Sequence, residues 1–190
     1  MGLATQVEMS GAELKLLQSL LFQECGVYYD EYCIPFLQER VRARLQSRGW
    51  SVNDLLALAS IVDAETSIDS ERVVIAGVYY NRLERKMRLE ADPTVQFILE
   101  DGPRRLKFSD LHKESAYNTY RHTGLPPGPI NNPARASIYA ALYPTRHTYY
   151  FFVANGLGGH TFTRTYSEHR RAAQRFHKFR EQQDASKEQG

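Results

Sequence analysis

The chain has 190 residues, of which 42% are hydrophobic and 24% are charged. This length and composition are typical of one globular domain with a hydrophobic core. The 24 basic and 22 acidic side chains leave a net charge of +2, which gives no electrostatic argument for a nucleic-acid partner. Cys25 and Cys33 lack metal-ligand spacing, and we interpret them as free thiols, with a disulfide as the alternative outside the cytoplasm.

The N-terminal part shows no targeting or membrane segment. Residues 1–8 lack a basic region followed by an apolar stretch, so no secretory signal is predicted. The apolar positions within 14–22 are interrupted by Lys15 and Gln18 and are too few to cross a bilayer. We therefore expect no membrane span and a soluble chain.

Helices are predicted through the first half of the chain. Apolar residues recur every three to four positions over 12–24 and 35–48, which predicts two amphipathic helices. Ser51 opens a sequence resembling a capping box, and an apolar run follows, so we expect a buried helix that ends near Thr66. Ser70 is the expected N-cap of a further helix, which runs to about residue 87 with Glu71 favourable at its positive end.

The second half mixes loops with short elements. Residues 88–132 are rich in Pro and Gly and have weak periodicity, which is typical of functional loops. Asn132 and Pro133 predict the start of a helix reaching residue 142. Residues 148–154 and 160–165 predict an antiparallel hairpin, and Ser167 is the expected cap of a last helix ending near residue 179. The predicted fold class is α+β: a helical core, long Pro/Gly-rich cleft loops and a small antiparallel hairpin.

Glu65 is the strongest candidate for chemistry. It follows an otherwise apolar helix, where loss of solvation would raise the pKa of a carboxyl group and allow it to donate a proton near neutral pH. The alternative is a helix-end glutamate that faces solvent. Asp63 projects to another side of the same helix and cannot be its partner, whereas Asp69 or Asp92 could approach it in space.

Other polar groups cluster later in the chain. The loop 117–132 offers neutral hydrogen-bonding groups beside aromatic rings, which suit a polyhydroxylated ligand, although such groups also stabilise their own turns. His160 could orient a substrate, pair with a carboxylate or cap the hairpin, and no second ligand at metal spacing accompanies it. A basic stripe on the last helix is either a solvated face or a site for an anionic partner. Its members are Arg164, Arg170, Arg171, Arg175, Lys178 and Arg180.

The order of short motifs resembles the YceG-like family, the endolytic murein transglycosylases. The similarity covers about residues 51–180. The motifs that carry it are LASIVDAET at 58–66, SER at 70–72, VYYNRL at 78–83, MRL at 87–89, ADPTV at 91–95, YNTY at 117–120, GLPPGPI at 124–130, NP at 132–133, FFVA at 151–154 and GGHTF at 158–162. Each motif is weak alone, and their shared order and spacing make the resemblance specific.

The resemblance implies a reaction and a set of site residues. Members cleave the β-1,4 bond between N-acetylmuramic acid and N-acetylglucosamine, leaving a 1,6-anhydro end and ending strand elongation, with one glutamate as acid and base. This implies Glu65 as the catalytic residue, without a metal or other cofactor. The matching positions expected to bind substrate are Asn81, Asp92, Thr94, Tyr117, Asn118, Tyr120, Asn132 and His160.

The resemblance also implies partners and a domain division. Peptidoglycan strands are the expected substrate and peptidoglycan synthases the expected protein partners, with no nucleic acid. We divide the chain into an N-terminal helical segment (1–50), a YceG-like catalytic domain (51–180) and a disordered tail (181–190). Family members usually carry a membrane helix and a LysM-like domain and face the periplasm or cell exterior, but neither part is visible here. A muramidase-type hydrolase and a non-catalytic wall-binding protein therefore remain alternatives.

Overall fold

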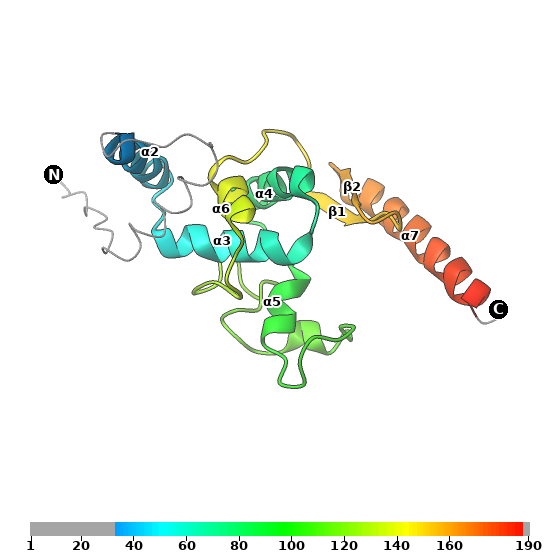
Figure 1. Cartoon of the computed structure of the whole chain (residues 1–190). Helices are drawn as coiled ribbons and strands as arrows, with labels where there is room; N and C mark the ends of the chain where they lie inside the picture. The colour runs from blue at the N-terminus through cyan, green and yellow to red at the C-terminus, as the bar shows by residue number, and fades with distance from the viewer. Residues whose placement is uncertain (1–32, 188–190) are drawn as a thin grey trace.

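The computed structural model describes residues 33–187, which form helices around a small hairpin (Figure 1). Their order confirms the predicted α+β class. The elements are α2 (Cys33–Gln46), α3 (Val52–Glu65), α4 (Asp69–Glu84), α5 (Asp92–Phe97), the 3-10 turn η1 (Asp110–His112), α6 (Arg135–Leu142), β1 (Phe151–Ala154), β2 (His160–Thr163) and α7 (Tyr166–Lys187). The helix predicted over 12–24 and the thiol of Cys25 lie outside the described residues.

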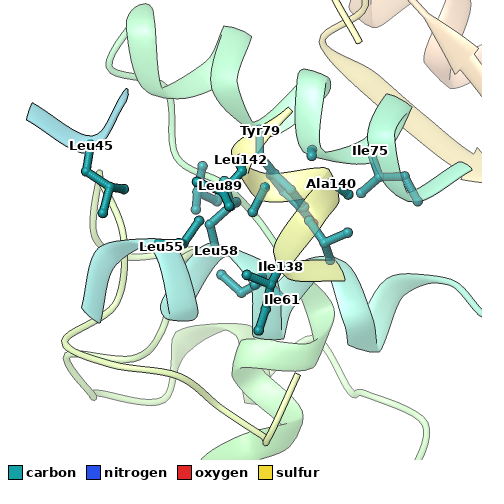
Figure 2. Close-up of a cluster of buried hydrophobic side chains, with 14 of the residues drawn as sticks. Leu45, Leu55, Leu58, Ile61, Ile75, Tyr79, Leu89, Ile138, Ala140 and Leu142 are labelled. Atoms are coloured by element: carbon teal, nitrogen blue, oxygen red, sulfur yellow. The ribbon is translucent and has the colours of Figure 1, made fainter. Parts of the chain in front are cut away.

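The hydrophobic core lies where α3, α4 and α6 pack against one another (Figure 2). Leu58 and Ile61 of α3 and Ile75 of α4 are fully buried, and Ile138 of α6 is 4% exposed. Helix α2 adds Leu45 to the same cluster. Burying such side chains contributes about 1.5–3 kcal/mol each, so this cluster fixes the three helices that carry the polar residues described below.

Helix α3 begins and ends as its sequence predicts. Ser51 Oγ accepts a hydrogen bond from the backbone N of Asp54 at 3.1 Å, and Asp54 Oδ2 accepts one from the backbone N of Ser51 at 2.8 Å. This reciprocal pair is a capping box. At the other end, Thr66 is extended and its Oγ1 accepts from Ile68 N at 3.0 Å. The helix therefore stops at Glu65, with the chain turning immediately after it.

Helix α4 packs closely against the segment that leads into the hairpin and donates hydrogen bonds to it. Gly77 lies so close to this segment that a Cβ there would meet Thr145 O at 2.4 Å, so only glycine permits the contact. One turn later, Asn81 Nδ2 donates to His147 O at 3.0 Å and to Tyr149 O at 2.8 Å. Asn81 thus binds the segment before the hairpin, and β1 begins at Phe151, later than the predicted residue 148.

The hairpin is antiparallel, with Phe152 opposite Phe162, and it packs against α7. Gly156 in its turn has φ +81°, a conformation that L-residues rarely adopt, and a Cβ there would lie 2.4 Å from the ring of Phe179. In Figure 1, α7 extends from the hairpin away from the helical core to the C-terminus. Its helical span reaches Lys187, further than the predicted end near 179.

Three predicted helix caps are wrong. Helix α4 begins at Asp69 behind Ile68 rather than behind Ser70, and α6 begins at Arg135, after the predicted Asn132 and Pro133. Ser167 lies inside α7, because the residue that caps this helix is Thr165, which exchanges two hydrogen bonds with Glu168. Thr165 Oγ1 accepts from Glu168 N at 3.2 Å, and Glu168 Oε2 accepts from Thr165 N at 3.0 Å. A cap depends on this reciprocity, which residue type alone does not specify.

Within residues 33–187, no helix combines the length and apolar character that a bilayer crossing requires.

Candidate active site

A pocket of about 400 Å³ opens where the end of α3 faces α4, the start of α5, the hairpin and α7. It combines three carboxyl groups with an arginine, two histidines and several aromatic rings. Its principal lining residues are Glu65, Tyr79, Arg82, Glu90, Asp92, Tyr120, Phe151, Phe152, His160, Tyr166, His169 and Phe176. A concave site with aromatic walls and a few convergent polar groups is the usual form of a ligand-binding pocket.

Glu65 presents its carboxyl group to this pocket from the last position of α3. Its Oε1 accepts a hydrogen bond from the Tyr79 hydroxyl at 2.5 Å. The pKa of Glu65 is raised from 4.5 to about 7. Burial is the largest cause of the rise and the charge of Asp92 adds to it, whereas the Tyr79 hydrogen bond and the charge of Arg82 oppose it. Protonated and ionised forms of Glu65 are therefore both populated near neutral pH, as a group that gives and takes a proton requires.

Tyr79 fixes the orientation of that carboxyl group. Its side chain is 1% exposed and packs edge-on against Phe152, with ring centroids 5.9 Å apart. Burial and the neighbouring Glu65 charge raise the pKa of Tyr79 well above its ordinary value, so its hydroxyl remains a donor. Within residues 33–187 this is the only hydrogen bond to the Glu65 carboxyl, which leaves its second oxygen available for a ligand.

Asp92 places a second carboxyl group in the same pocket, at the first turn of α5. Its Oδ1 accepts a hydrogen bond from the Tyr120 hydroxyl at 2.5 Å. Burial and this carboxylate raise the pKa of Tyr120, so the phenol stays neutral. The pair supplies an acceptor and a ring beside Glu65, and its negative charge helps to keep Glu65 protonated.

His160 reaches the pocket from the start of β2, and Glu71 holds it there. Glu71 Oε2 lies 2.7 Å from His160 Nδ1, while Glu71 Oε1 accepts from His160 N at 2.8 Å. Although partial burial opposes the change, the hydrogen bonds from His160 lower the pKa of Glu71, which therefore remains a carboxylate. The sequence pattern assigned Glu71 only to a helix terminus, because its partner lies 89 residues away.

Arg82 lines the pocket, although the sequence pattern did not indicate it as a site residue. The residue is 7% exposed, and its guanidinium donates to Tyr150 O at 2.6 Å, to Arg88 O at 3.1 Å and to Leu89 O at 2.8 Å. Its Nη1 also lies 3.1 Å from Glu90 Oε2. Arg82 thus joins α4 to the strand and the loop that form two walls of the pocket, and it brings a positive charge close to Glu65.

Of the predicted site residues, Glu65, Asp92, Tyr120 and His160 meet in the pocket, and the other five do not line it. Asn81 binds the segment before β1, as described above. Thr94 is fully buried, with its Oγ1 2.8 Å from Thr119 Oγ1. Asn118 is also fully buried and donates to Leu111 O at 3.1 Å and Lys113 O at 2.7 Å.

The two remaining predicted positions, Tyr117 and Asn132, also do not line the pocket. The Tyr117 ring packs against Phe97, with ring centroids 4.9 Å apart, and Asn132 is exposed. Asp63, to which no catalytic role was given, is bound to Arg72 at 3.0 Å and to Ser137 Oγ at 2.7 Å, so it joins α3 to α6. Among the described residues, no group of three or more His, Cys, Asp or Glu could hold a metal ion.

Comparison with known proteins identifies a family and several relatives that this chain resembles. A model of the YceG-like family matches residues 27–175. The chain is 39% identical over 138 residues to a Bacillus subtilis protein named endolytic murein transglycosylase, covering 73% of this chain and 38% of that protein. It is 31% identical over 123 residues to the Streptococcus pneumoniae D39 protein of the same name, covering 62% of this chain and 22% of that protein.

A solved structure agrees with these sequence matches. The crystal structure of a yceG-like protein from Listeria monocytogenes superposes with a TM-score of 0.63 at 38% identity, covering 73% of this chain and 45% of that one. The chain thus spans less than half the length of these relatives. The family model covers most of the chain, and this match confirms the resemblance that the sequence motifs indicated. The chain belongs to the YceG-like family.

Proposed function

We propose that this chain is the catalytic part of an endolytic murein transglycosylase, with Glu65 as its acid and base. The observation that carries the proposal is the Glu65 carboxyl itself. It lies in the pocket, receives one hydrogen bond from Tyr79 at 2.5 Å and has a pKa of about 7. The names of the B. subtilis and S. pneumoniae relatives support the same activity.

The proposed reaction uses one carboxyl group twice. Protonated Glu65 donates its proton to the glycosidic oxygen as the bond from that oxygen to C1 of the muramoyl residue breaks. The resulting Glu65 carboxylate then takes the proton from the muramoyl 6-hydroxyl, whose oxygen forms the new bond to C1. The products are a strand with a free 4-hydroxyl and a 1,6-anhydro-muramoyl end. No water is consumed, and Glu65 returns to its protonated form.

The pocket residues support this reaction in distinct ways. Tyr79 orients the carboxyl through Oε1, which leaves the other oxygen to carry the transferred proton. Asp92 disfavours the ionised form of Glu65, and aromatic rings on the hairpin and α7 offer faces to a sugar ring. We further propose that such cleavage terminates growing strands and that peptidoglycan synthases are the associated proteins.

One observation favours a second candidate, a muramidase-type hydrolase. Ordinary glycoside hydrolysis uses two carboxyl groups, and Asp92 is a second carboxyl in the Glu65 pocket. In that reaction, water would take the place of the muramoyl 6-hydroxyl and a reducing end would form. Tyr120 already occupies Asp92 Oδ1 at 2.5 Å, which weakens the case for Asp92 as an activating base.

Digestion of purified sacculi with the 190-residue chain, followed by mass spectrometry, separates these candidates. Anhydro-muropeptides support the transglycosylase, and reducing ends support the hydrolase. Glu65→Gln should abolish product, whereas Glu84→Gln, on the exposed part of α4, should not. If wild type and Glu65→Gln are equally inert yet both bind sacculi, the chain is a wall-binding protein and the enzymatic proposal fails.

A further inference from the structure

A second cavity adjoins the Glu65 pocket. It has a volume of about 330 Å³, and Glu90 and Tyr120 line both cavities, so the two share a wall. Its other residues include Arg88, Phe108 and Arg121, and we name this cavity the Arg88 pocket. A polymer with one sugar at Glu65 would therefore place an adjacent group in or beside the Arg88 pocket.

The charges around the Arg88 pocket favour an anion. Arg88 is exposed, and no hydrogen bond or ion pair engages its guanidinium within residues 33–187. Arg121 keeps one contact, from Nη2 to Glu114 at 2.7 Å. The carboxylate of Glu90 is paired with Arg82 at 3.1 Å, so it cannot also neutralise Arg88 fully. An exposed guanidinium with free donors binds carboxylate or phosphate in preference to neutral groups.

The position of Arg88 is set by the fold. Its backbone pairs with Thr123 in an isolated antiparallel bridge, and its carbonyl accepts from Arg82 Nη1 at 3.1 Å. Two residues later, Glu90 has φ +49°, a left-handed conformation that non-glycine residues rarely adopt. The bridge and this hydrogen bond hold the Arg88 backbone at the edge of the pocket.

An exposed aromatic ring completes the pocket. Phe108 is 79% exposed, and its ring lies 4.7 Å from that of His112. An exposed ring beside free cationic groups suits a ligand that carries both an anion and an apolar or sugar face.

We propose that the Arg88 pocket binds a carboxylate of the acidic peptide stem that substitutes the glycan strand. This inference rests on the proposed function, because it names which part of a murein substrate lies next to the scissile bond. The stem is joined to the muramoyl lactyl group and carries free carboxylates. Arg88, assisted by Arg121, would therefore distinguish peptide-bearing strands from bare ones.

Binding to two soluble tetrasaccharides, identical except for the stem peptides, tests the proposal. The full chain carrying Glu65→Gln, which prevents turnover, is titrated with each in a calorimeter. The peptide-bearing ligand should bind about tenfold tighter or more, as expected for a charge-assisted hydrogen bond, and added salt should reduce the difference. Adding Arg88→Gln should remove the preference, whereas adding Arg146→Gln, an exposed arginine outside both pockets, should leave it.

The outcomes separate the two proposals. Equal affinity for both ligands, or a preference that survives both Arg88→Gln and Arg121→Gln, overturns the Arg88 pocket as a stem site. Circular dichroism of each variant checks that loss of binding is not loss of folding. Cleavage is measured separately with the wild-type chain: a chain that prefers the peptide-bearing ligand but cuts neither retains the stem site and refutes the proposed transglycosylase.

Discussion

The raised pKa of Glu65 predicts a pH-dependent gain in stability for Glu65→Gln. In the folded chain the pKa of Glu65 rises from 4.5 to about 7. Each pKa unit corresponds to about 1.4 kcal/mol, so ionising this carboxyl lowers the folding stability by about 3 kcal/mol. Glutamine keeps a similar shape and an oxygen that can accept from Tyr79 but cannot ionise.

The direction of this stability change with pH follows from proton binding to Glu65. Between pH 4.5 and 7 the folded chain holds a proton on Glu65 that the unfolded chain has released, so the stability of the wild type falls as the pH rises. Its disadvantage relative to Glu65→Gln should be near zero at pH 4, grow through that interval and level off above pH 7 at about 3 kcal/mol.

Urea unfolding of both proteins at pH values from 4 to 8 measures this difference. Subtracting the two free energies of unfolding at each pH removes the contributions of the other titrating groups. Glu84→Gln, at an exposed position, serves as the matched control and should give a difference with little dependence on pH. A flat difference for Glu65→Gln between pH 4 and 8 would show that the carboxyl is not desolvated in the folded chain, and the reasoning would fail.

Three further predictions concern the surroundings of Glu65. Tyr79→Phe removes a hydrogen bond that favours the ionised form, so the pKa of Glu65 should rise above about 7, and the alkaline limb of the pH–rate profile should move to higher pH with it. Glu71→Gln should lower stability at pH 7 by about 1–2 kcal/mol, because His160 loses a carboxylate partner. That deficit should shrink in acid, since the pKa of Glu71 is lowered and its stabilising charge is lost on protonation. Gly156→Ala should cost roughly 1–3 kcal/mol in urea unfolding, because its Cβ would lie 2.4 Å from a ring of α7.

Control variants and measurements test the physical reasons given for Tyr79→Phe, Glu71→Gln and Gly156→Ala. Tyr117→Phe removes a hydroxyl outside the Glu65 pocket and should leave the alkaline limb in place. Gly158→Ala has a similar positive φ of +92° but no atom within 4 Å of the added Cβ. If it destabilises as much as Gly156→Ala, backbone strain rather than the contact with α7 is responsible. An unchanged acid profile for Glu71→Gln would contradict the assigned hydrogen bonds between Glu71 and His160.

The sequence predicted local features better than distant pairings. The capping box at Ser51 and the end of α3 near Thr66 both follow from neighbouring residues, and the structure confirms them. The α+β class and the hairpin also follow from local periodicity. By contrast, residue type alone does not distinguish the reciprocal cap at Thr165 from a cap at Ser167, which is an equally suitable residue type.

The sequence predicted the residues of the site less well than it predicted the helices. Asn81 and Asn118 bind backbone carbonyls and Thr94 binds Thr119, and no pattern in the chain reveals which way a polar side chain points. The roles of Glu71 and Arg82 could not be predicted from the sequence for a different reason. Their partners His160 and Tyr150 lie 89 and 68 positions away, so only the folded chain brings them together.

The many bonds of Arg82 have a practical consequence for anyone wishing to change the working pH of this domain. Its guanidinium both joins two pocket walls and favours the ionised form of Glu65, so any substitution alters integrity and acidity at once. The charge of Asp92 raises the pKa of Glu65 from the pocket wall, and the Asp92 side chain is held there by one hydrogen bond, from the Tyr120 hydroxyl. Tuning should therefore start from Asp92, where a neutral substitution would make Glu65 more acidic and leave the framework of the pocket in place.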